Sequence, residues 1–144
     1  MKQIYILLIA LLMGLSANAE TSGTCGPNLR WHLTDNGVLT ISGKGEMYDY
    51  SDYNRAPWSK SDIKRIIIGD GVTTIAGHAF YYCRSLTSVT IPNSVTTIGE
   101  VAFADCSALT SVTIPNSVTE IGGGAFWIVF ITIEQPKLIR NIRV

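Results

Sequence analysis

Residues 71–93 read GVTTIAGHAFYYCRSLTSVTIPN, and residues 94–116 read SVTTIGEVAFADCSALTSVTIPN. The two segments align without a gap at an offset of 23 positions. A third copy begins at Ser117 and keeps the pattern as far as Ala125-Phe126. Self-similarity at one fixed spacing is typical of repeat proteins, in which each unit is stabilised by stacking on its neighbours. The sequence therefore predicts a mostly β fold, a short solenoid of parallel strands.

The order of residue types within one repeat predicts its internal layout. Leu86, Val89 and Ile91 lie in a β-forming run in which Ser88 and Thr90 point the other way. This alternation is typical of a short strand with one buried face. The proline and asparagine that follow favour a turn, and a second short apolar segment comes after it. The Ala-Phe pair then lies in a compact stretch, for which we expect 3₁₀ or helical structure.

Equivalent side chains of stacked repeats lie above one another, so the apolar positions that the copies share form one continuous core. We expect Phe80, Phe103 and Phe126 to form an aromatic spine in that core. A degenerate repeat precedes these copies, because Ile63, Ile66 and Ile68 fall at the apolar strand positions when the period is extended backwards. We place the repeats at residues 56–126, where Ala56-Pro57 correspond to the later Ala-Phe pairs.

The repeat unit resembles that of BspA-like leucine-rich repeat proteins. Its pattern is S-V-T-x-I-G-x-x-A-F-x-x-C-x-x-L-T-S-V-T-I-P-N, and the preceding segment adds residues 23–26, 39–43, 47–50 and 56–58 to the resemblance. The resemblance covers about residues 23–126. It implies an exported surface protein of a bacterium or protist, in a family with some members implicated in adhesion to host proteins or other cells. It implies no catalytic residue.

Before the repeats, apolar and polar side chains alternate over residues 29–34, Asp35-Asn36-Gly37 follows, and residues 38–42 form a second β-forming run. This pattern predicts a β-hairpin with an Asn-Gly turn. A hairpin here would cover the open end of the first repeat, which otherwise exposes apolar core and a strand edge. We therefore assign residues 20–55 to an N-terminal cap hairpin and loop, with Trp31 and Trp58 as buried residues of the cap.

Residues 1–19 have the features of a signal peptide. Lys2 precedes an apolar run from Ile4 to Leu15, and Ala17-Asn18-Ala19 supplies the small residues that signal peptidase recognises. As a helix this run is about 18 Å long, shorter than the roughly 30 Å hydrocarbon core of a membrane. We expect residues 1–19 to be removed, no membrane span to remain, and the protein to be secreted, periplasmic or attached to the cell surface.

Charge and motifs exclude several function classes. The chain has 11 basic and 11 acidic residues, and removal of Lys2 leaves 10 against 11, a net charge near −1. This balance gives no electrostatic attraction for nucleic acid or for an anionic membrane. His32 and His78 are not at metal-ligand spacing from cysteine or from each other, and the variable position of His78 is expected to be exposed. No nucleophile elbow or phosphate-binding loop is present, so we expect no enzyme activity, cofactor or metal.

The segment after Phe126 departs from the repeat. Val129 and Thr132 stand where the pattern expects cysteine and leucine, within a dense apolar run that starts at Trp127. Residues 127–144 are either a specialised C-terminal cap, whose strand at 131–133 continues the sheet in a shifted register, or foreign sequence after a frameshift or truncation. The amino-acid sequence leaves both open.

The three cysteines of an exported chain invite a disulfide. Cys83 and Cys106 occupy equivalent positions in adjacent repeats, about 4.8 Å apart along the stack. Either they form a disulfide, or they pack as a ladder of buried thiols, which we favour because cysteine packs as a small hydrophobic residue. Cys25 lies in the cap and has no obvious partner.

Two surfaces are candidates for binding. The loop at 48–54 contains three tyrosines beside acidic and amide residues, and such rings stack on sugars or contact proteins, although the loop also has a simpler role as the crossing to the first repeat. The other surface is the exposed strand face, where repeated small hydroxyls suit an extended partner or are simply solvated. The candidate residues are Tyr48, Tyr50, Tyr53, Ser88, Thr90, Ser111 and Thr113.

These observations favour an exported, non-enzymatic module for protein interaction or adhesion, with an extracellular or cell-surface protein as its partner. One alternative is a surface protein that binds glycans through the tyrosine-rich loop. Another is a truncated product of a longer repeat protein.

Overall fold

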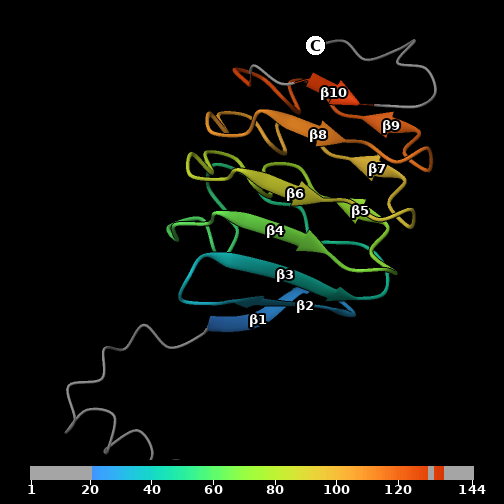
Figure 1. Cartoon of the computed structure of the whole chain (residues 1–144). Helices are drawn as coiled ribbons and strands as arrows, with labels where there is room; N and C mark the ends of the chain where they lie inside the picture. The colour runs from blue at the N-terminus through green and yellow to red at the C-terminus, as the bar shows by residue number, and fades with distance from the viewer. Residues whose placement is uncertain (1–20, 130–131, 135–144) are drawn as a thin grey trace, which may run out of the picture.

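The computed structural model describes residues 21–129 and 132–134, so the predicted signal peptide lies outside the described residues. This part of the chain contains ten strands and no helix, and therefore no helix able to span a membrane. Figure 1 shows the strands stacked along one axis, with β1 at one end and β10 at the other. The strands are β1 (Thr21–Gly26), β2 (Leu29–Leu33), β3 (Val38–Gly43), β4 (Arg65–Ile68), β5 (Thr74–Ile75), β6 (Ser88–Thr90), β7 (Thr97–Ile98), β8 (Ser111–Thr113), β9 (Glu120–Ile121) and β10 (Thr132–Glu134).

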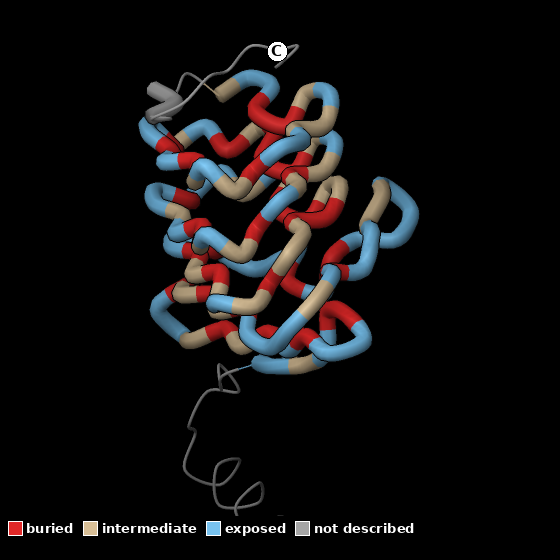
Figure 2. Tube along the Cα trace, turned by 90° about the vertical axis from the view of Figure 1, so that its right-hand side faces the viewer, coloured by how far each residue is buried: buried red, intermediate tan, exposed pale blue. Residues whose placement is uncertain are grey.

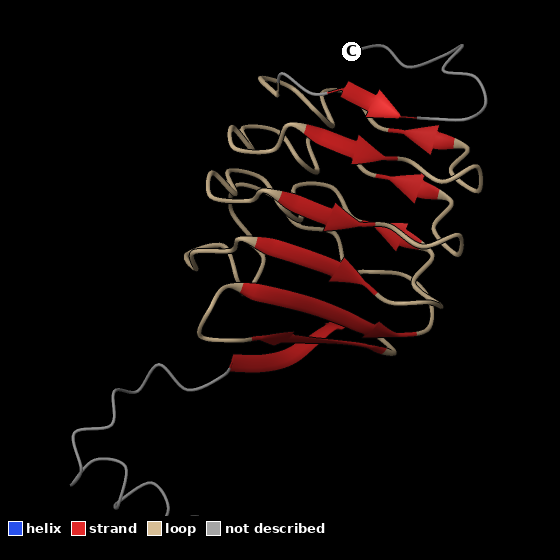
Figure 3. Ribbon diagram, viewed as in Figure 1, coloured by secondary structure: helices blue, strands red, loops and turns tan. Residues whose placement is uncertain are grey.

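The strands form two columns, which Figure 3 shows in red. One column, here called the front column, contains the sheet β1-β2-β3-β4-β6 and the pair β8-β10. The other contains the short strands β5, β7 and β9, which pair in parallel. In both columns strands of successive repeats run parallel, as β4 and β6 do where Ile66 lies opposite Val89. The prediction of a mostly β fold with parallel strands is confirmed.

The N-terminal segment pairs antiparallel before the parallel column begins. Strands β2 and β3 pair with Leu29 opposite Gly43, and Gly37 in the turn between them has a φ of 83°. A Cβ at this glycine would lie 2.6 Å from the carbonyl oxygen of Asp62, so both the turn and the contact with the next segment require glycine. Strand β1, which the sequence did not indicate, pairs antiparallel with β2.

The compact stretch that follows the short strand of each repeat was expected to be 3₁₀ or helical, and this expectation is wrong for the described residues. Consecutive turns take its place, and alternate amides of the turns have different partners. The Cys83 amide donates within its own repeat to Phe80 O at 3.3 Å, whereas the Phe80 amide donates to Ala102 O of the next repeat at 2.9 Å. Every second amide is therefore used to join repeats, which a helix does not allow.

Left-handed residues make these turns possible. Val101 has a φ of 47° and Asp105 a φ of 59°, and 23 positions earlier His78 and Tyr82 have φ values of 57° and 68°. The expectation that the position of His78 is exposed is wrong, because His78 is half-buried. The position is also constrained by its backbone, which adopts the left-handed conformation. Residues other than glycine rarely adopt this left-handed conformation, because their Cβ crowds the backbone.

An aromatic stack runs through the core. The rings of Phe80 and Phe103 lie 5.3 Å apart, and those of Phe103 and Phe126 lie 5.5 Å apart, which confirms the predicted spine. Trp58 continues the stack 5.7 Å from Phe80 and donates from Nε1 to Ala79 O at 2.8 Å. Pro57 lies 23 positions before Phe80 and was predicted to correspond to it. Trp58, the next residue in the chain, takes that place in the stack instead.

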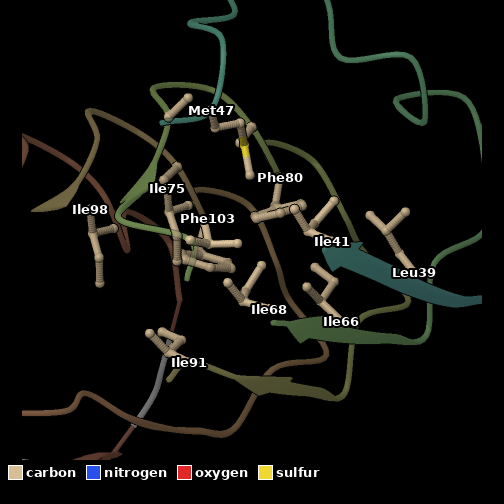
Figure 4. Close-up of a cluster of buried hydrophobic side chains, with 14 of the residues drawn as sticks. Leu39, Ile41, Met47, Ile66, Ile68, Ile75, Phe80, Ile91, Ile98 and Phe103 are labelled. Atoms are coloured by element: carbon tan, nitrogen blue, oxygen red, sulfur yellow. The ribbon is translucent and has the colours of Figure 1, made fainter. Parts of the chain in front are cut away.

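Aliphatic residues of both columns surround the aromatic stack. Figure 4 shows Ile66 and Ile68 of β4 gathered in the same interior as Ile75 of β5 and the ring of Phe80. These residues are at most 2% exposed. Figure 2 shows buried positions along the inside of every repeat and exposed positions on the loops around them. Each repeat thus contributes one layer to a single core.

The tail keeps part of the repeat geometry. Ile128 has a φ of 58° and stands 23 positions after Asp105, whose φ is 59°. Strand β10 then pairs in parallel with β8, where Thr132 lies opposite Ser111, an offset two positions shorter than the period. The tail therefore supplies a strand in a shifted register, at 132–134 where 131–133 was expected, and residue 131 is outside the described residues.

Candidate binding surfaces

The hydroxyl residues singled out in the sequence share one face of the front column. Ser88 and Thr90 of β6 and Ser111 and Thr113 of β8 are all exposed. Val112, between the last two, is only 2% exposed, so the strand alternates between surface and core. The structure therefore brings the four predicted residues together on adjacent strands, and we call this surface the front face.

The front face extends toward the N-terminus through residues that pair with these strands. Arg65 lies opposite Ser88, and Ile67 lies opposite Thr90. Arg65 is exposed and Ile67 is half-buried. The face is thus a flat strip of small hydroxyls with one cation and one aliphatic residue at its β4 side.

A groove adjoins the front face at the ends of β6 and β8 and the turns that follow them. These strands lie side by side in Figure 1 but belong to different hydrogen-bonded sheets. A groove of about 460 Å³ lies beside them, and Ile91 on its β6 side is 9% exposed whereas the equivalent Ile114 is fully buried. No sequence signal indicates the groove, because both strands read Ser-Val-Thr. The groove is lined by Val89, Thr90, Ile91, Asn93, Thr113, Ile114, Pro115 and Asn116.

The three tyrosines of the 48–54 loop do not form one surface. Tyr53 is fully exposed, and Tyr48 is 49% exposed. Tyr50 is half-buried, and its ring packs edge-on against Trp58 at 5.8 Å. Burial, with smaller contributions from Cys25 and Tyr48, raises the pKa of the Tyr50 hydroxyl well above its ordinary value. Tyr50 therefore belongs to the edge of the core, and two of the three rings remain for a ligand.

Sequence reasoning missed a second aromatic cluster, on the turns of the first repeat. Tyr81 and Tyr82 pack edge to face at 5.1 Å, and His78 packs against Tyr81 at 6.0 Å. The Arg84 guanidinium lies 4.1 Å from the centre of the Tyr82 ring. A comparison of the repeats could have found this cluster, because these positions differ between copies whose core positions are the same.

The cysteines are free thiols in this structure. The Cys106 thiol is fully buried and donates to Phe80 O at 3.3 Å. Its hydrogen bond with Cys83 and its burial raise its pKa far above the ordinary value. Burial also raises the pKa of Cys25 to about 11. The thiols of Cys25 and Cys106 fill space in the core and lack the lowered pKa of a reactive cysteine.

Within residues 21–129 and 132–134, no cluster of histidine, cysteine and acidic residues is suited to hold a metal ion. The described site residues are hydroxyls, aromatic rings and an arginine, which are groups that recognise a surface by contact and hydrogen bonding.

Comparison with protein families accounts for the repeat. The family model of the BspA type leucine rich repeat region (6 copies) matches residues 54–143, more than half of the chain. The chain belongs to the BspA-type leucine-rich repeat family. No curated protein matches it.

Two solved structures show the same repeat architecture. A leucine-rich repeat protein from Eubacterium ventriosum is 28% identical, with a TM-score of 0.64 over 84% of this chain, and the chain spans only 41% of that protein's length. A leucine-rich repeat protein from Bacteroides capillosus is 23% identical, with a TM-score of 0.54, and the match covers 82% of this chain and 100% of that one. At this identity the second likeness shows the fold alone.

Proposed function

We propose that this BspA-type chain is an exported, non-catalytic module that binds an extracellular or cell-surface protein through its front face, as an adhesion-type interaction protein does. The observation that carries the proposal is the exposure of Ser88, Thr90, Ser111 and Thr113 on adjacent strands next to an open groove. Small hydroxyls offer hydrogen bonds at little cost in side-chain entropy, and the groove offers partly buried aliphatic surface.

In this proposal the stacked repeats form a short solenoid, and the antiparallel segment β1-β2-β3 is its N-terminal cap. Leu29, Trp31 and Leu33 of β2 are at most 8% exposed, so this strand turns an apolar side toward the first repeat. The cap ends the column with antiparallel pairing, which keeps the edge of the parallel strands from solvent. The repeats behind the front face are thereby held rigid, which lowers the entropy cost of binding.

Binding to a panel of purified extracellular-matrix and cell-surface proteins tests the proposal. The variant Thr90→Lys/Thr113→Lys places two long cations on the front face, and we expect it to weaken binding at least tenfold. The control is Thr96→Lys/Thr119→Lys, which changes the same residue types at the same spacing of 23 positions and also at exposed sites. The hydroxyls of Thr96 and Thr119 donate to the carbonyls of Thr73 and Thr96, so cooperative urea unfolding must show that the control still folds. Equal binding by both variants and the unchanged chain, or no saturable binding to any protein, contradicts the proposal.

A second candidate function is glycan binding by the 48–54 loop, and the exposure of Tyr48 and Tyr53 favours it. A glycan array separates the two functions. Glycan binding that is lost in Tyr48→Ala/Tyr53→Ala and kept in Thr90→Lys/Thr113→Lys supports the second function. We use two substitutions because Tyr50 packs against Trp58, and its replacement would also disturb the core.

A further inference from the structure

The first repeat carries aromatic and cationic side chains at positions where the second repeat has small ones. Tyr82 and Arg84 correspond to Asp105 and Ser107, 23 positions later. The backbone is alike in both repeats, since Tyr82 and Asp105 have φ values of 68° and 59°. The second repeat therefore shows that the fold does not need a tyrosine or an arginine at these positions.

Tyrosine is also an unfavourable choice for the position of Tyr82. Left-handed backbone conformation is unfavourable for most residues, because Cβ crowds the following carbonyl oxygen, whereas asparagine and aspartate tolerate it better. The ring does not recover this cost by burial, because Tyr82 is 48% exposed. The left-handed conformation itself recurs at Asp105 and Ile128, so the choice of tyrosine, and not the conformation, distinguishes the first repeat.

Contacts between these side chains hold Arg84 in a defined orientation. Its guanidinium lies 4.1 Å from the centre of the Tyr82 ring, and Nη2 donates to the Tyr82 hydroxyl at 2.6 Å. The Tyr81 ring supports Tyr82 edge-on at 5.1 Å. In the described part of the chain no carboxylate pairs with Arg84, including that of Asp105 in the next repeat. The remaining guanidinium N–H groups are thus presented to solvent as a preorganised fork.

We propose that Tyr81, Tyr82 and Arg84 form a second binding site, which recognises a carboxylate side chain on an acidic segment of a protein partner. A planar guanidinium binds a carboxylate through two parallel hydrogen bonds, and its stacking on a ring fixes the direction of the fork. Tyrosine and arginine are also among the residues most enriched in the energetically dominant parts of protein interfaces.

The shape of the site favours a protein over a sugar. The hollow that Tyr81 shares with the neighbouring loop has a volume of only about 20 Å³, room for about one water molecule and too small for a sugar ring. Arg55 and Asp52, which carry opposite charges, both line it. Tyr82 and Arg84 lie outside the lining of this hollow, so the guanidinium is left to meet a partner on the surface.

An array of dodecapeptides rich in aspartate and glutamate tests the site, with each peptide printed beside its asparagine and glutamine counterpart. We expect a subset of acidic peptides to bind and their amide counterparts to bind at least tenfold more weakly. The variant Tyr82→Asn/Arg84→Ser introduces residues as small as those of the second repeat, and we expect it to fold normally and to lose at least tenfold in affinity. Arg84→Lys keeps the charge without the fork, and we expect an intermediate loss.

Three outcomes overturn the inference: no binding of acidic peptides, equal binding by Tyr82→Asn/Arg84→Ser, or binding only to sialic-acid or uronic-acid glycans on a parallel array. Cooperative urea unfolding of the variant shows that any loss comes from the site and not from misfolding. The front-face proposal fails separately, because it depends on the effect of Thr90→Lys/Thr113→Lys on the protein panel.

Discussion

The rings of Phe103 and Phe126 lie face to face, 3° from parallel, with their centres 5.5 Å apart. The two residues are 23 positions apart, so each repeat of the sequence adds one ring to the stack. Phe103 has a second ring, that of Phe80, 5.3 Å away. Phe126 is 7% exposed and stacks on one described ring only.

This difference predicts unequal costs for the same substitution. Phe103→Ala removes a fully buried ring from the middle of the stack, and we expect it to lower the free energy of unfolding by about 3–5 kcal/mol. Phe126→Ala is expected to cost less, because its site at the end of the described stack can relax. Urea denaturation of both variants measures the difference, and an equal or reversed order would show that the stack is not the centre of the core.

Replacement of Gly99 by a larger residue is predicted to destabilise the stack on steric grounds. A Cβ at this position would lie 2.3 Å from the Gly77 backbone nitrogen of the preceding repeat. Gly99→Ala should therefore push the repeats apart and lower the free energy of unfolding by about 1–3 kcal/mol. Gly123→Ala is the matched control, because a Cβ there would have no other atom within 4 Å, and its midpoint in urea should stay near that of the unchanged chain.

The thiols are expected to react in a fixed order. Cys25 and Cys106 are fully buried with raised pKa values, whereas Cys83 is only half-buried. In the folded protein iodoacetamide should modify Cys83 first, and the other two should react only after unfolding. Peptide mass spectrometry after timed labelling measures the order. Rapid labelling of Cys106 in the folded state would contradict this packing.

Alkaline pH is expected to destabilise the protein through Cys25. Burial raises the thiol pKa from 9.0 to about 11, so the folded state binds the proton more tightly than the unfolded state does. This contribution to stability is fully present below pH 9 and is lost as the pH rises to about 11. Thermal unfolding across that range should show the loss, and Cys25→Ala should show a shallower decline. An identical decline in both proteins would assign it to other groups, such as Tyr50.

The repeating part of the fold could be predicted because identical residues must lie in identical places when repeats stack. The positions of Phe80, Phe103 and Phe126 in the core, and those of Ile66 and Ile68 on β4, followed from the period alone. The burial of Trp31 and Trp58 followed from the cap hypothesis.

What the period could not predict depends on contacts that differ from repeat to repeat. Trp58 reaches the aromatic stack from a position one residue later than the period places it. The gap in hydrogen bonding between β6 and β8 separates strands of the same sequence, so no local signal distinguishes it. The candidate surfaces were predicted in part: the four hydroxyl residues lie together, but Tyr50 turns into the core and the Tyr82–Arg84 pair was missed.

The alternating amides of the turns constrain how this molecule can change in length. Phe80 donates to Ala102, and Phe103 donates to Ala125 in the same way, so each repeat offers the next one the same set of partners. Insertion or deletion of one whole repeat restores every such bond, whereas insertion of a single residue in the turns exchanges the amides that face inward with those that face the next repeat. Evolution and protein engineering can therefore lengthen or shorten the stacked region most easily by whole repeats.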